Sequence, residues 1–334
     1  MTGGNPLLEL STLPSDLARV EQTLRDSVRT DDPYLTELAS HLILAGGKRG
    51  RPAFAIGAAA TAASAIVAVS DDVIRGAVSV ELVHLGSLYH DDVMDDATTR
   101  RTVESVNARW GNLQAILAGD FLLARASEIA ASLGTEVAGL LAATIGRLCE
   151  GQILELQHTY DSARSEDVYL RSIEGKTASL YATACRIGAI VSGQSREQIE
   201  ALTEFGLAYG MAFQIVDDVL DVVATDEQLG KPAGHDLVEG VYTLPVIRAL
   251  NGSAPGVDQL RTMLGSPLSL EEMATARAIV RESGEIATSL ATASAYVQRA
   301  NEVLAPFADS EARRGLGGAA EHLLASVGDI ASAA

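Results

Sequence analysis

The residues best suited to chemistry lie at 81–101, ELVHLGSLYHDDVMDDATTRR, where an apolar segment ends in four aspartates and two arginines. Asp91 and Asp95 are four residues apart, so the helical repeat places both on one face. Like charges at this spacing destabilise an isolated helix by about 0.2–0.5 kcal/mol. A hard divalent cation with oxygen ligands would offset that repulsion. The stretch therefore predicts a cation site.

The same pattern occurs a second time. Residues 217–221 read DDVLD, which matches DDVMD at 91–95, and again an apolar helical segment precedes them. One acidic cluster on a helix is usually a solvated face, but two of the same form favour a carboxylate cage. Mg²⁺ is typically shared between one or two carboxylates and a substrate phosphate. We therefore predict a phosphate-bearing substrate and a set of metal ligands: Asp91, Asp95, Asp217 and Asp221.

A cationic turn provides a partner for that phosphate. GGKRGRP at 46–52 combines a glycine pair, which ends one helix, with Pro52, which can start the next. Lys48, Arg49 and Arg51 lie between them. Alone, such a turn is as often a plain surface loop. Beside two magnesium-type clusters it predicts a diphosphate clamp, because arginine offers paired donors and lysine a point charge.

Helices must position these residues. The 334-residue chain is 47% hydrophobic and only 4% aromatic, and Ala-rich stretches with apolar residues three and four apart dominate it. We predict an all-α, single-domain bundle of ten or more helices around a central catalytic cavity. The domain spans 1–334, with an N-terminal amphipathic helix within 5–35 and a core from about 36. A further helix is expected over 112–132.

Composition excludes several classes of function. A net charge of −19 argues against binding to nucleic acid or to anionic membranes. Cys149 and Cys185 stand in apolar helical contexts without zinc-type spacing, so reduced, packed thiols are expected. The N-terminus lacks the pattern of a signal peptide. The uncharged segment Pro52–Ser70 is weakly apolar, which favours a buried core helix over a membrane span. We expect a cytoplasmic protein.

Taken together, the motifs resemble one family. DDxxD twice, GGKRGRP, GKTA and FQIVDD occur in the order of the trans-isoprenyl diphosphate synthase (polyprenyl synthetase) family, over about Leu35 to Pro245. The resemblance implies Mg²⁺-dependent head-to-tail (1′-4) transfer of an allylic diphosphate's prenyl group to isopentenyl diphosphate, with three Mg²⁺ ions and a homodimer. The spacing inside DDVMD is similar to that of the long-chain bacterial branch.

The resemblance also implies roles for single residues. Isopentenyl diphosphate would be bound by Lys48, Arg51, His84 and Arg101. The allylic diphosphate would be bound by Arg100, Lys176, Thr177, Gln214 and Lys231. The catalytic set would be Asp91, Asp92, Asp95, Lys176, Gln214, Asp217 and Asp218.

Three local features of the sequence need comment beside the resemblance to the family. GKT at 175–177 is not a nucleotide-binding P-loop, because Leu170 stands where the motif needs glycine. We expect Lys176 and Thr177 to begin a helix, whose N-terminus suits a diphosphate. Residues 102–105, TVES, replace the family's Gly-x-Pro-Thr run, and Val241 stands where many relatives have lysine.

Product length should depend on residues one and two turns before Asp91. Short-chain relatives carry a bulky residue at positions matching Gly86 and Ser87, both small here, with Val83 next on that face. The open tunnel implies a long all-trans product, suited to a quinone side chain. Since each buried CH₂ contributes about 0.8 kcal/mol, release of that product to a membrane should be slow.

Other functions remain open. The principal alternative is a short-chain farnesyl or geranylgeranyl diphosphate synthase. A class I terpene cyclase would need no isopentenyl diphosphate site, so GGKRGRP and His84 argue against it. A non-catalytic partner subunit would be expected to lose aspartates from one motif, and here both are intact. An acidic metal-binding scaffold would not need the ordered cationic residues.

Overall fold

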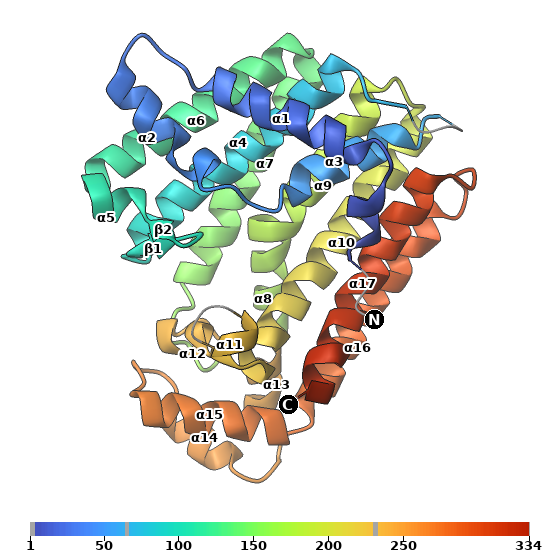
Figure 1. The fold of residues 1–334 in the computed structure, drawn as a ribbon. Helices are drawn as coiled ribbons and strands as arrows, with labels where there is room; N and C mark the ends of the chain where they lie inside the picture. Colours follow the sequence, from blue (N-terminus) through green and yellow to red (C-terminus); the bar gives the residue numbers. More distant parts are fainter. Residues whose placement is uncertain (1–3, 64–66, 230–232, 334) are drawn as a thin grey trace.

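The computed structural model describes residues 4–63, 67–229 and 233–333. These residues form a mainly helical assembly with a single short hairpin among them (Figure 1). The first half contains η1 (Pro6–Glu9), α1 (Leu13–Ser27), α2 (Pro33–Leu44), α3 (Gly50–Ala60), α4 (Asp71–Met94), β1 (Thr99–Arg100), β2 (Val103–Glu104), α5 (Val106–Trp110), α6 (Asn112–Ser132) and α7 (Thr135–Leu156). The second half contains α8 (Glu166–Ile173), η2 (Glu174–Ala178), α9 (Ser179–Val191), α10 (Arg196–Val223), α11 (Asp226–Leu229), α12 (His235–Glu239), α13 (Leu244–Asn251), α14 (Val257–Met263), α15 (Leu270–Glu282), α16 (Glu285–Leu304) and α17 (Glu311–Ala333). The predicted all-α bundle is confirmed.

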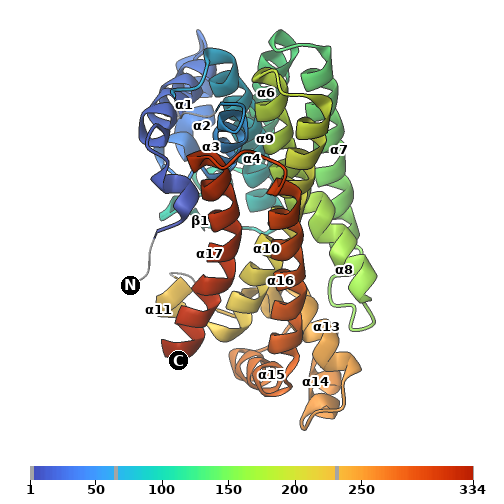
Figure 2. The same ribbon diagram turned by 90° about the vertical axis from the view of Figure 1, so that its right-hand side faces the viewer.

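The core lies where α3, α4, α9 and α10 pack against one another. Two glycines of α10 let it approach α9 and the end of η2 closely. A Cβ at Gly206 would lie 2.6 Å from the Tyr181 carbonyl oxygen, and one at Gly210 would lie 2.5 Å from the Ala178 Cα. Larger side chains at either position would separate the helices. In Figure 2, α16 and α17 run beside α10 and cover its outer side.

The N-terminal region corrects one prediction. The single helix expected within 5–35 is divided into η1, α1 and the start of α2. Pro14 and Pro33 each stand in the first turn of a helix, and the residue before a proline is disfavoured in the helical conformation. Asp32 confirms the break, because its side chain accepts a hydrogen bond from the Tyr34 N–H at 2.9 Å and caps α2.

The segment weighed as a membrane span is a core helix where the structure describes it. Helix α3 is buried along Pro52–Ala59 and ends at Ala60, and α4 begins at Asp71. A different helix, α7, is the one described segment long and apolar enough to cross a bilayer, with a mean hydropathy of 1.3. A single such helix is weak evidence of a span, and this one places much of its apolar surface on the outside of the protein.

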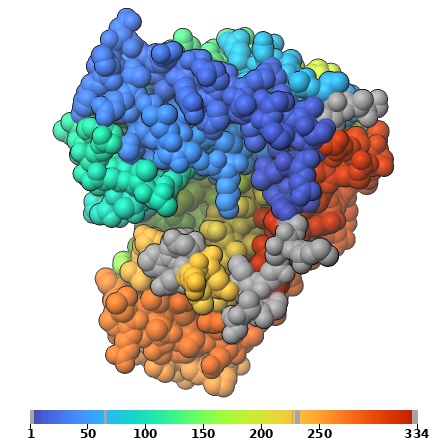
Figure 3. Space-filling view, viewed as in Figure 1, coloured from blue at the N-terminus to red at the C-terminus, as the bar shows by residue number. Residues whose placement is uncertain are grey.

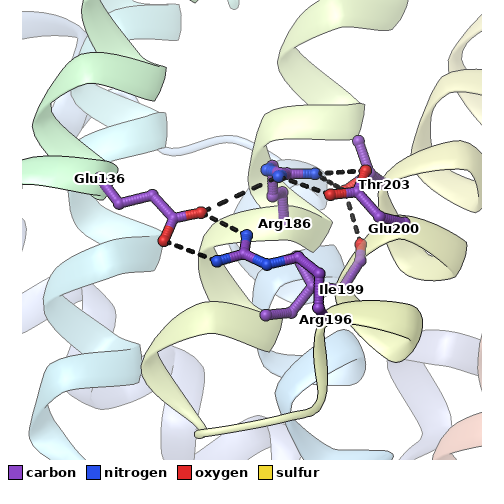
Figure 4. Close-up of polar contacts among 6 residues, drawn as sticks. All are labelled: Glu136, Arg186, Arg196, Ile199, Glu200 and Thr203. Atoms are coloured by element: carbon purple, nitrogen blue, oxygen red, sulfur yellow. Dashed lines mark hydrogen bonds and ion pairs between the residues drawn. The ribbon is translucent and has the colours of Figure 1, made fainter.

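A charged cluster ties α7 to α9 and α10 at the end remote from the acidic motifs (Figure 4). Arg186, 17% exposed, donates to Glu200 at 2.8 and 2.9 Å and to Thr203 at 3.0 Å. Glu136 of α7 is 3.9 Å from Arg186 and pairs with Arg196 at 2.5 Å. The cluster therefore joins three helices through one half-buried guanidinium.

Replacing that guanidinium should lower stability without touching the cleft. We expect Arg186→Met to reduce the free energy of unfolding by about 1 kcal/mol, near the upper value for exposed pairs, because Arg186 connects several partners. Arg196→Met, at a fully exposed position, should have a smaller effect. Urea denaturation measures both. An effect of Arg186→Met that does not shrink in high salt would show that lost packing, rather than charge, is responsible.

Candidate active site

The acidic and cationic motifs meet in a cleft below α1–α4. Figure 3 shows the surface hollowed between the N-terminal half and the orange segment of α14 and α15. A cavity of about 580 Å³ is lined by Lys48, Arg51, His84 and Arg101. A second cavity, of about 90 Å³, is lined by residues expected at the allylic diphosphate: Lys176, Thr177 and Gln214. All four residues predicted to bind isopentenyl diphosphate thus line the larger cavity, and three of the allylic set line the smaller one, whereas Arg100 lines neither of these two cavities.

The larger cavity, which we call the cationic cavity, also has walls that no motif indicated. Asn5 and Leu7 of η1 and His322 and Ser326 of α17 line it together with Asp217. Residues at the two ends of the chain therefore complete this site. Apart from amphipathic helical pattern, the sequence carries no signal that would place them there.

A hairpin directs the paired arginines in different directions. β1 and β2 pair antiparallel, and Arg101 and Thr102 form the turn at φ 53° and 66°, which two-residue hairpin turns require. Arg100 donates through Nε to Asp92 at 2.7 Å. Arg101 instead donates to the Leu42 carbonyl at 3.2 Å and to that of Gly46. The altered 102–105 loop is thus the structure that separates the two side chains.

Arg49 does not belong to the clamp predicted from GGKRGRP. Its side chain is 4% exposed and pairs with Glu21 and with Glu81, the latter at 3.0 Å. It also donates to the Ile43 carbonyl at 3.0 Å. Arg49 lines the cavity beside Lys48 and Arg51, but these partners occupy its guanidinium, so its role is to stabilise the turn. The sequence missed this because Glu21 and Glu81 are distant along the chain.

His84 lies beside these cations. Burial, followed by the charges of Arg51 and Arg101, lowers the pKa of His84 well below its ordinary value. The imidazole is therefore neutral at physiological pH and can donate one N–H to a diphosphate oxygen.

The first acidic motif divides into two kinds of aspartate. Asp92 is fully buried, and its Oδ1 accepts from Arg100 at 2.6 and 2.7 Å. Asp91 and Asp95 instead interact electrostatically with Lys176 and Arg100. Burial raises the pKa of Asp91, against the opposing effect of Lys176. These two carboxylates therefore carry negative charge that the protein only partly compensates, which suits a bound cation.

Two aspartates of the second motif, Asp218 and Asp221, accept hydrogen bonds from other groups of the protein. Asp218 accepts at both oxygens, from Tyr169 at 2.5 Å and from Gln214 at 2.7 Å. Asp221 is 3% exposed and accepts from the backbone N–H groups of His235 and Asp236, each at 3.3 Å. It thereby caps the start of α12. Its predicted role as a metal ligand stays a prediction.

Lys176 and Thr177 do not begin a helix, and that expectation was wrong. Helix α8 continues through a π-helical turn, Glu174–Ala178, directly into α9, with the Ser179 N–H bonded to the Glu174 carbonyl. The backbone N–H groups are therefore engaged and cannot bind a phosphate. π-Helical turns are frequent at functional sites because they displace side chains from the regular spacing.

Glu155 was not identified from sequence. Its carboxylate accepts from Lys176 Nζ at 2.7 Å. Burial lowers the pKa of Lys176, but Glu155 and Asp91 outweigh this effect and the net pKa is raised. Lys176 therefore stays charged. The sequence signal was the EGQILELQ segment at 150–157, whose Glu155 faces inward only because α7 packs against the π-helical turn.

The chain-length candidates occupy different surroundings. A Cβ at Gly86 would lie 3.0 Å from the Gly119 carbonyl and 3.2 Å from Leu123, so Gly86 packs directly against α6. Val83 is fully buried, and the Ser87 hydroxyl donates to the His84 carbonyl at 2.9 Å. Val241 lines the smaller cavity. Lys231 lies outside the described residues.

The chemistry of the acidic side chains fits Mg²⁺. Within residues 4–63, 67–229 and 233–333, no group of three or more His, Cys, Asp or Glu side chains could hold a metal. Mg²⁺ binds through one or two carboxylates together with substrate phosphate and water. Asp91 and Asp95 could hold it, and a diphosphate would supply further oxygens.

Magnesium affinity should depend on pH. Loss of surrounding water, with the charges of Glu239 and Asp91, raises the pKa of Asp95 to about 6. A raised carboxyl pKa favours the folded state below the ordinary value of about 4, and this contribution is lost as pH rises through about 6. Mg²⁺ must displace the proton, so its affinity should fall up to about tenfold per pH unit below 6. Mg²⁺ titration followed by thermal unfolding at pH 5 and 7.5 measures this; equal affinities would contradict it.

Comparison with known proteins identifies the class. The polyprenyl synthetase family model matches residues 32–281. The chain is 40% identical over 305 residues to nonaprenyl diphosphate synthase of Mycobacterium tuberculosis, covering 90% of this chain and 89% of that protein. It is also 40% identical over 276 residues to geranylgeranyl diphosphate synthase of Methanosarcina mazei, covering 81% and 83%.

A solved structure gives the same result. Polyprenyl synthase from Caulobacter crescentus, complexed with calcium and isoprenyl diphosphate, superposes with a TM-score of 0.89 at 34% identity, covering 97% of this chain and 98% of that one. The family match and these relatives thus identify a prenyltransferase. The chain belongs to the polyprenyl synthetase family.

Proposed function

We propose that this enzyme adds isopentenyl diphosphate to an allylic diphosphate by head-to-tail (1′-4) transfer and makes a long all-trans polyprenyl diphosphate. The observation that carries the proposal is the pair of neighbouring cavities, one lined by Lys48, Arg51 and Arg101 and the other by Lys176 and Gln214. The three cations of the larger cavity suit one diphosphate, whereas the smaller cavity, with Lys176 as the one cation among its described lining residues beside Glu155, Asp218, Asp236 and Glu239, would need Mg²⁺ to bind the other. A cyclase would require only one such site.

The side chains suggest how the reaction proceeds. Arg100 and Lys176 stabilise negative charge as the allylic C–O bond breaks, which is electrostatic catalysis at the point where charge develops. Up to three Mg²⁺ ions, held by Asp91, Asp95 and Asp217, would neutralise further charge on the leaving diphosphate. Lys48, Arg51 and His84 hold isopentenyl diphosphate so that its double bond forms the new C–C bond. The departing diphosphate then accepts the proton that the product loses.

The assay uses labelled isopentenyl diphosphate, Mg²⁺ and primers of two, three and four isoprene units. Chromatography reads product length. Elongation well beyond four units supports the proposal. Termination at three or four units favours the short-chain alternative, which the identity to a geranylgeranyl diphosphate synthase keeps open. No product with any primer contradicts prenyl transfer by this chain alone and favours a missing partner subunit.

Ser87 provides a direct test of the open tunnel. We expect Ser87→Phe to shorten the product while the first condensation continues, because a phenyl ring one turn before Asp91 would fill space that the growing chain needs. Gly86→Ala is a poor substitute, since its Cβ would press on α6. Unchanged product length in Ser87→Phe would move the end of the tunnel to other residues.

We infer that the enzyme is a homodimer that uses α6 and α7. Leu113 and Leu117 of α6 are 74% and 67% exposed, and Ile153 and Leu156 of α7 are 55% and 50% exposed. Contiguous apolar surface of this kind marks an interaction site. Light scattering should give twice the 34.9 kDa chain mass, and Leu117→Glu should give the single-chain mass.

The proposal also places the enzyme in the cytoplasm, with isopentenyl and allylic diphosphates as its ligands and no nucleic acid partner. Membrane contact is limited to release of the apolar product, whose use is a quinone side chain. Turnover that is equally fast with and without detergent or vesicles would argue against membrane-assisted release.

A further inference from the structure

A series of three hydrogen bonds joins α8, α10 and the π-helical turn at Asp218 of the second acidic motif. The Tyr169 hydroxyl donates to Asp218 Oδ2 at 2.5 Å, and Gln214 Nε2 donates to Asp218 Oδ1 at 2.7 Å. The Thr177 hydroxyl donates to Gln214 Oε1 at 2.8 Å. All four residues line the smaller cavity, which Lys176 shares.

In this series of hydrogen bonds, the direction from donor to acceptor is fixed at each step. Both oxygens of Asp218 accept, so the amide nitrogen of Gln214 faces the carboxylate and the amide oxygen faces Thr177. A threonine hydroxyl carries one proton. Since that proton is donated to Gln214, Thr177 offers only oxygen lone pairs to a ligand in the cavity. If the amide were turned over, Thr177 would instead point its proton at the ligand.

The anchor of the series is rigid. Tyr169 is 1% and Asp218 4% exposed. The Arg164 guanidinium lies 5.6 Å from the centre of the Tyr169 ring, and it donates to the Ser172 hydroxyl at 2.5 Å and to the Tyr242 carbonyl at 3.1 Å. Burial, with the nearby Asp218 charge, raises the pKa of Tyr169 well above its ordinary value, so the phenol remains a donor.

We propose that Tyr169 and Asp218 are positioning residues of the allylic site, which lock the Gln214 amide and thereby turn the lone pairs of Thr177, and not its proton, toward the substrate. The inference rests on the proposed prenyl transfer, in which the allylic carbon becomes electron-poor as the C–O bond breaks. An oxygen lone pair stabilises that carbon, whereas a hydroxyl proton repels it. Asp218 thus differs in role from Asp91, because protein donors occupy both of its oxygens.

Tyr169→Phe tests the anchor, because it removes one hydroxyl and keeps the ring. We expect the single-turnover rate of condensation, measured by rapid quench, to fall about tenfold, the effect of losing a hydrogen bond to a charged group. The KM for isopentenyl diphosphate and the half-saturating Mg²⁺ concentration should stay within about twofold.

Tyr89→Phe is the matched control. Tyr89 is fully buried, and its hydroxyl donates to the Leu38 carbonyl of α2 at 2.7 Å. This bond is not part of the hydrogen-bond series at Asp218. Tyr89→Phe removes at least as many buried hydrogen bonds as Tyr169→Phe, because the Tyr89 hydroxyl also accepts from the Leu42 N–H at 3.4 Å, and it should lose at least as much thermal stability. We expect only Tyr169→Phe to slow condensation.

Coupling between the residues supplies two further readouts. In a Thr177→Val background, which already breaks the series, Tyr169→Phe should slow condensation by less than about twofold more. In the metal-free protein, the Tm losses of Tyr169→Phe and Asp218→Leu should sum to more than the loss in the double variant, because each single change removes the bond between Tyr169 and Asp218.

The outcomes separate the two claims. Absence of turnover in the wild type overturns the proposed function and this inference with it. Wild-type turnover with an unslowed Tyr169→Phe overturns the inference alone. Recovery of Asp218→Asn at high Mg²⁺ would also overturn it, because Asp218 would then be a metal ligand.

Discussion

Asp91→Ala should abolish prenyl transfer while the protein remains folded. Asp91 faces Lys176 and Arg100 across the cleft, and its raised pKa reflects negative charge held where solvent is scarce. Loss of one metal ligand removes transition-state stabilisation, for which we expect a fall in kcat of about 10³-fold or more. The variant should unfold at a temperature equal to or above that of the metal-free wild type, because it removes the cost of burying the Asp91 charge, which exceeds the attraction of Lys176 and Arg100.

Asp72→Asn is the matched control for that experiment. It changes an aspartate in the first turn of the same helix, far from the cleft, and should leave turnover unchanged. Labelled isopentenyl diphosphate incorporation measures all three proteins. Near-normal turnover by Asp91→Ala would contradict the carboxylate cage on which the proposed mechanism depends.

The second large effect, a loss of stability, should come from substituting Gly151, which has no side chain to take part in the chemistry. A Cβ at Gly151 of α7 would lie 2.4 Å from the Lys176 backbone nitrogen and 2.7 Å from the Ser172 carbonyl oxygen. Backbone cannot yield as a flexible side chain can, so Gly151→Ala must push the π-helical turn away. We expect a loss of about 1–3 kcal/mol in unfolding free energy, the usual cost of overpacking. Lys176 and Thr177 would move with the turn, so the KM for the allylic substrate should rise.

Gly139→Ala gives the opposite expectation on the same helix. No heavy atom lies within 4 Å of a Cβ at Gly139, so alanine should stabilise α7 by about 0.5–1 kcal/mol through its better helix propensity. Urea denaturation and allylic KM measured on both variants separate a helix effect from a contact effect. Equal behaviour of the two variants would show that α7 and the π-helical turn are not tightly packed.

Local pattern predicted the parts of the site that depend on spacing. Asp91 and Asp95 lie at the end of α4, and α6 has the bounds expected for it, because helical periodicity and capping residues are read directly from neighbours in the chain. Lys48 and Arg51 line the cavity that the turn predicted. For each of these residues, the information lay within a few positions of it.

Pairings between distant residues were not predictable in this way. Arg49 forms ion pairs with Glu21 and Glu81, which lie on two other helices, so its guanidinium is already occupied. The hydrogen bond between Glu155 and Lys176 could not be predicted, because it depends on the packing of α7 against the π-helical turn. That turn itself replaced an expected helix start, because α8 and α9 are continuous through it. In each case tertiary packing decided what a local pattern could not.

Residues from opposite ends of the polypeptide line the cationic cavity, so the cavity is complete only when synthesis of the chain is nearly finished. Asn5 and Leu7 meet Leu323 and Ser326 around one site. During translation both acidic motifs emerge from the ribosome long before residue 326, so a nascent chain carries these carboxylates while the cationic cavity is still open on one side. A chain that stops short of α17 would retain every charged residue of the motifs and still lack a complete site.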